Sequence, residues 1–181
     1  METSELQARI EELIDEHGFE CRGYAPASEL QVREEVRNMC ASNMCHMYDR
    51  NWACPPAVGP IEKFRDKIAS LSTAIVFESV AEMEDEFDID VMMDTEELHK
   101  ERFEELVKDV RPLAPDALLL GAGTCTICDE CAYPDEPCRF PDRQAVSMEA
   151  AGLVVSDVCK SAGIPYNHGP NFIAYISCIV I

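Results

Sequence analysis

Seven of the ten cysteines in this 181-residue chain fall into two close groups. Thiolates are soft ligands that suit iron and zinc, so closely spaced cysteines point to a metal centre. We call the two sets the first and the second cysteine group. The first group is Cys40, Cys45 and Cys54, and the second is Cys125, Cys128, Cys131 and Cys138.

The second group has the spacing Cys-x2-Cys-x2-Cys-x6-Cys, which lets one loop wrap several thiolates around a metal centre. Its first three members, Cys125, Cys128 and Cys131, reproduce the two-residue gaps of a bacterial ferredoxin motif. Cys138 either closes the same cluster or serves a neighbouring one. The spacing predicts a 4Fe-4S cluster, with zinc as the alternative, because structural zinc prefers two separated pairs of ligands.

The first group has the looser spacing Cys-x4-Cys-x8-Cys, and its last member stands directly before Pro55-Pro56. Its three cysteines predict a second metal site beside the first cluster, and whether the chain holds one cluster or two stays open. Three cysteines leave one coordination position open, which is typical of catalytic rather than structural metal sites. The candidates for that position are water, a substrate, His46, Cys21, Cys159 and Cys178.

Several cysteines and histidines have an ordinary alternative role. Cys159 and Cys178 lie in apolar segments, where a free cysteine behaves as a small buried hydrophobe. We expect His17 and His99 on helix surfaces and His168 in an ordinary loop.

The two cysteine groups alternate with helical and strand patterns. Apolar residues at helical spacing predict helices, and short runs rich in β-branched residues predict strands. The predicted helices cover 4–18, 29–36, 61–71, 95–111 and 148–162, and the predicted strands cover 19–24, 72–80, 117–120 and 172–181. We therefore expect an α/β sandwich forming one domain over residues 1–181, with a mixed sheet of four or five strands, 172–181 as a central strand, and the cysteine loops at one end.

Charge and composition exclude some partners. Thirty-five acidic against fifteen basic residues give a formal net charge of −20 and a pI near 4.4. Such a chain repels nucleic acids and anionic membrane surfaces, so a protein partner should present a basic face. The first 18 residues predict an amphipathic helix instead of a secretory signal, and no apolar run is long enough to span a membrane. We expect a cytoplasmic protein, where cysteines serve metal or redox chemistry more often than disulfides.

Five short segments and the terminal strand carry a resemblance to known proteins. The segments are 52–56, 125–131, 136–141, 147–152 and 163–166. Together they resemble one known family of uncharacterised proteins. It is the cysteine-rich family labelled predicted metal-binding protein, common in archaea and anaerobic bacteria, and the resemblance extends from about Cys40 onward. The resemblance implies a metal or iron-sulfur site on the matching cysteines and an anaerobic lifestyle, but no settled reaction. The family has a tighter cysteine pair where this chain has the Cys40 to Cys45 gap.

Three functions remain open at this point. The leading hypothesis is an iron-sulfur protein that transfers electrons to or from a redox partner protein in anaerobic metabolism. The second is a metalloenzyme whose three-cysteine site leaves a position for a small-molecule substrate. The third is a zinc-stabilised interaction module without redox activity. Whether the protein is an enzyme is left undecided, and no catalytic residue is assigned.

Overall fold

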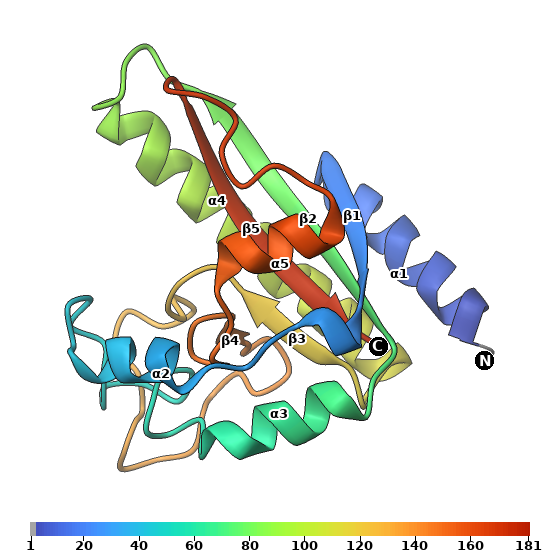
Figure 1. Ribbon diagram of the computed structural model, residues 1–181. Coiled ribbons are helices and arrows are strands. Elements are labelled where there is room, and N and C mark those ends of the chain that lie inside the picture. Colours follow the sequence, from blue (N-terminus) through green and yellow to red (C-terminus); the bar gives the residue numbers. More distant parts are fainter. Residues whose placement is uncertain (1–2) are drawn as a thin grey trace.

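Helices and strands alternate along most of the chain in the computed structural model, which describes residues 3–181 (Figure 1). The predicted domain began at residue 1, so its first two residues lie outside the described part. The helices are α1 (Thr3–Glu16), η1 (Ala27–Glu29, a 3-10 turn), α2 (Glu34–Ala41), α3 (Ile61–Ala69), α4 (Ile89–Leu113) and α5 (Val155–Ala162). The strands are β1 (Cys21–Pro26), β2 (Thr73–Glu82), β3 (Leu118–Gly121), β4 (Val146–Ser147) and β5 (Phe172–Val180).

The five strands form one sheet in the order β1-β2-β5-β3-β4. Neighbouring strands are antiparallel except β3 and β4, which are parallel. The mixed α/β class and the number of strands are as predicted. β5 is central, as its almost wholly apolar sequence predicts, because a strand with neighbours on both sides is buried on both faces. Within residues 3–181, no helix is long and apolar enough to cross a membrane.

Alternating residues of β2 build two cores on opposite faces of the sheet. Ile75 and Phe77 pack against α1 and α4, together with Leu106 and Ile179. Val76 points the other way, into a core that includes residues of α3 and α5. The molecule therefore has helices on both faces of the sheet, with α5 crossing in front of the strands in the view of Figure 1.

His99 was expected at the surface, and this prediction was wrong. Its side chain is fully buried between α4 and the sheet, where Nδ1 lies 2.9 Å from Ser79 Oγ and Nε2 lies 2.8 Å from Ser177 Oγ. Ser79 on β2 and Ser177 on β5 present hydroxyls to the same face. A polar side chain between apolar neighbours on α4 is tolerated because both ring nitrogens are hydrogen-bonded.

The predicted helix 148–162 is in fact two separate pieces. Ser147 Oγ accepts a hydrogen bond from Ala150 N at 3.0 Å and caps a single turn. The turn ends at Gly152, whose φ of 85° is left-handed and whose missing Cβ would lie 2.8 Å from Ile61 Cδ1. Helix α5 starts only at Val155, because the chain must first pass this close contact with α3.

Other boundaries also differ from the prediction. Residues 30–33 are extended, held by the hydrogen bond from Arg33 N to Gly152 O at 2.8 Å, so the helix predicted at 29–36 begins at Glu34 and runs into the first cysteine group. Helix α4 begins at Ile89 because Asp88 caps it, accepting from Val91 N at 3.2 Å. It continues through Pro112 for one residue, since its last turn tolerates the loss of one donor. Strand β1 begins two residues later than predicted.

Replacing Gly23 with alanine should destabilise the fold. A Cβ at this position would lie 2.2 Å from the backbone oxygen of Ala162 and 2.7 Å from Ile164 Cγ2, so the end of α5 would have to move away from β1. Overpacking of this kind costs about 1–3 kcal/mol. Urea unfolding measures the loss, with the conservative Tyr24→Phe in the same strand as control. A Gly23→Ala variant as stable as the wild type would show that this contact is loose.

Candidate metal centre

The two cysteine-bearing loops lie at one end of the molecule, beside α2 and α3 (Figure 1). The loop that carries the second group leaves the sheet at Gly121 and returns at Val146, where the short pairing of β3 with β4 holds its two ends side by side. Arg111 of α4 reinforces the return, donating to the backbone oxygens of Asp142 at 3.1 Å and Gln144 at 2.7 Å. The sheet thus clamps the base of a loop that has little regular structure of its own.

All four cysteines of the second group line one cavity. The loop folds back over itself, helped by the hydrogen bond of 2.8 Å from Arg139 Nη1 to Glu130 O. The remaining walls come from this loop and from the segment before Cys54. They are Asn51, Trp52, Ala53, Ile127, Ala132, Arg139, Phe140 and Gln144. The side chains that sequence spacing predicted to act together therefore face a common space.

Burial at this cavity keeps the Cys125 thiol protonated unless positive charge is bound nearby. Burial raises the pKa of Cys125 to about 11, and the nearby Glu104, Cys138 and Cys128 raise it further, although a backbone hydrogen bond from Ile127 opposes them. Several thiolates cannot share a buried space without positive charge, because like charges disfavour one another's ionised form. An all-sulfur donor set with a partly buried wall fits a thiophilic metal centre, whether iron-sulfur or zinc.

One member of the first group, Cys54, lies close to the loop of the second. Cys54 Sγ is 3.3 Å from Thr124 Oγ1, and Thr124 directly precedes Cys125. Burial raises the pKa of Cys40, the nearby Arg37 opposes this, and Glu149, Cys45 and Cys54 raise it further. Cys54 is buried, Cys40 is half-buried and Cys45 is exposed. The first group is thus the more open of the two.

Polar contacts fasten the two loops together. The buried Asn51 donates from Nδ2 to Thr124 Oγ1 at 3.1 Å and accepts from Ala53 N at 2.9 Å. Trp52 donates from Nε1 to Glu136 O at 2.9 Å, and its ring meets that of Tyr133 edge to face with 4.9 Å between centroids. The segment 51–54 therefore carries Cys54 of the first group and also contacts the loop of the second group. Sequence analysis did not identify Asn51 or Thr124, because nothing in a single sequence indicates that they would meet.

Comparison with known families supports the metal assignment. Residues 24–181 match the sequence profile of a family described as Predicted metal-binding protein (DUF2284). The chain belongs to this family. Searches of curated proteins and of solved structures gave no significant match. Both cysteine groups of this family member lie inside the matched region, whereas Cys21 lies before it.

The structure of this family member also locates the other candidate ligands. Cys159 and Cys178 are fully buried in the apolar core, as expected, and burial raises the pKa of Cys159 to about 12. Cys21 on β1 lies opposite Glu78 on β2 in the strand register. The carboxylate oxygen Oε1 of Glu78 lies 2.9 Å from His168 Nε2. His46 is exposed beside the first group, and His17 contacts Asp109 on α4.

The described residues, 3–181, contain no set of three His, Cys, Asp or Glu side chains that converge closely enough to hold one metal ion. Metal binding to this family member would therefore require the cysteine side chains to move closer together.

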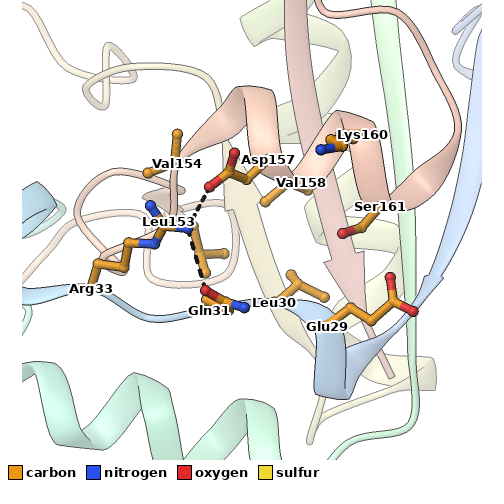
Figure 2. A pocket seen from close by; sticks show the side chains of 10 residues that line it. All are labelled: Glu29, Leu30, Gln31, Arg33, Leu153, Val154, Asp157, Val158, Lys160 and Ser161. Atoms are coloured by element: carbon orange, nitrogen blue, oxygen red, sulfur yellow. Dashed lines mark hydrogen bonds and ion pairs between the residues drawn. The ribbon is translucent and has the colours of Figure 1, made fainter.

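A separate cavity of about 400 Å³ lies between the segment 29–33 and α5 (Figure 2). Arg33 lines one side of it and forms an ion pair of 2.7 Å with Asp157. Its lining contains no cysteine or histidine, so it is not part of the metal centre.

Proposed function

We propose that this protein binds a 4Fe-4S cluster through Cys125, Cys128, Cys131 and Cys138 and transfers electrons. The observation that carries the proposal is one cavity that all four cysteines line. They come from one loop, whose two ends are held together by the sheet. A bound cluster of this kind gains and loses one electron without making or breaking bonds in the protein. The chain's own part is to supply four thiolates and to shield them with Trp52, Ile127 and Phe140, which line the same cavity.

The first group supports a second centre next to the cluster. Thr124 joins the two, since its hydroxyl contacts Cys54 Sγ and its peptide leads directly to Cys125. Electrons would pass between the two centres through this part of the protein. The exposure of Cys45 favours an accessible metal position, so a metalloenzyme that uses the cluster as its electron source is the alternative function.

We propose a basic redox partner in the cytoplasm of an anaerobic cell. A groove of about 530 Å³ runs along α4 to Thr126 and Ile127, the two residues between the first pair of cluster cysteines. Its α4 side is mainly acidic: Met93, Asp94, Glu96, Glu97, Lys100, Glu101 and Glu104. Docking of a basic surface there would bring the partner next to the cluster, and complementary charge would speed the encounter.

Anaerobic purification followed by iron and acid-labile sulfide analysis tests the proposal. We expect a brown protein with about four irons and four sulfides per chain for one cubane, and more if the first group holds a second centre. A colourless protein that carries zinc and no sulfide would instead establish the zinc-stabilised module and refute electron transfer.

A further inference from the structure

Arg37 has an unusual environment for an arginine. It lies on α2, one turn before Cys40, and stacks over the Phe64 ring with 5.6 Å from its guanidinium carbon to the ring centroid. Its Nη1 donates to Gly59 O at 2.8 Å and so ties α2 to the end of the loop that carries the first group. The nitrogens Nε and Nη2 are buried and have no hydrogen-bond partner among the described residues.

The two unpartnered nitrogens lie on one edge of the guanidinium, where both of their N–H bonds point the same way and can be donated to an anionic group. A buried donor left unpaired is destabilising, because it has lost its hydrogen bonds to water without gaining others. Among the ion pairs formed within residues 3–181, none includes Arg37, although the chain has 35 acidic residues. The free edge is therefore a donor without an acceptor in a strongly acidic protein.

We propose that this edge of Arg37 serves the metal-bound first group, donating hydrogen bonds to the sulfur of Cys40 and supplying the positive charge that offsets its thiolates. This inference rests on the proposed metal binding at Cys40, Cys45 and Cys54. The geometry of α2 agrees with it. Arg37 stands three residues before Cys40 in the helix, so the two side chains lie on the same face. Arg37 is thus a positioning residue that makes a trio of thiolates tolerable in a chain of net charge −20.

Titration of the reduced, metal-free full chain with Co²⁺ tests the role, because cobalt bound by thiolates gives an intense charge-transfer absorption. The variant Cys54→Ser defines which part of that absorption belongs to the first group. Arg37→Gln should weaken this part at least tenfold in dissociation constant and shift its band. Arg37→Lys should recover part of the loss, since it retains the charge but not the parallel donors.

Arg65→Gln is the matched control, because it removes the same charge from the exposed face of neighbouring α3. Equal weakening in Arg37→Gln and Arg65→Gln would reduce the effect to net charge and overturn the inference, as would wild-type affinity in Arg37→Gln. A loss of melting temperature in metal-free Arg37→Gln, without rescue by lysine, would show a purely structural role. If Cys54→Ser removes no cobalt absorption from the wild type, metal binding at the first group itself fails.

Discussion

Replacing Cys128 with serine should remove most of the brown colour and about four irons per chain, because a serine oxygen is a poor ligand for iron and an incomplete cubane is lost as a unit. Cys128 is half-buried on the wall of the shared cavity, so the substitution should leave the fold intact. Iron and sulfide analysis after anaerobic reconstitution measures the loss, and circular dichroism checks the fold.

Two further serine variants make this result specific. Cys54→Ser should remove only metal held by the first group and leave the four-cysteine cluster, since Cys54 is not among the residues of that cavity. Cys21→Ser is the control for a half-buried cysteine away from both loops and should change no metal content. Loss of all colour in Cys54→Ser would mean that Cys54 ligates the main cluster. Full colour in Cys128→Ser would refute the ligand assignment.

Stability should fall steeply in mild acid because of His99. Burial, followed by the nearby Lys100 and Arg102, lowers the pKa of His99 to about 3. The unfolded chain takes up this proton near the ordinary pKa of about 6.5, so the unfolded state binds more protons between these two values. Stability is therefore lost as the pH falls from about 6.5 to 3, by up to about 1.4 kcal/mol per pH unit from this residue.

Urea unfolding of the metal-free protein at several pH values between 7 and 4 measures this slope. The variant His99→Gln should be less stable at pH 7, since it cannot satisfy both Ser79 and Ser177, but its stability should decline less steeply in acid. Carboxylates contribute to both slopes, so the difference between the two proteins isolates His99. His46→Gln, at an exposed position, is the control. Equal slopes for wild type and His99→Gln would show that His99 becomes protonated in the folded state.

Several elements could be predicted because their signals are local. The apolar run 172–180 indicated a buried strand, and the helical stripe before Gly18 indicated α1. The helix predicted at 148–162 failed because its break depends on contact of Gly152 with Ile61, a residue 91 positions earlier. The two-residue strand β4 carried no signal, since only its pairing with β3 defines it. His99 looked like a surface residue because its partners lie on two distant strands.

The sequence by itself determined the sulfur side chains and the spacing of the second cysteine group, because both are properties of the residue order within one short loop. It also determined the acidic surface. Only the tertiary structure decided that the two groups are neighbours, since the contact between Cys54 and Thr124 joins segments 70 residues apart. The unpartnered edge of Arg37 likewise depends on packing, because burial and hydrogen-bond partners exist only once α2, α3 and the loop between them have come together.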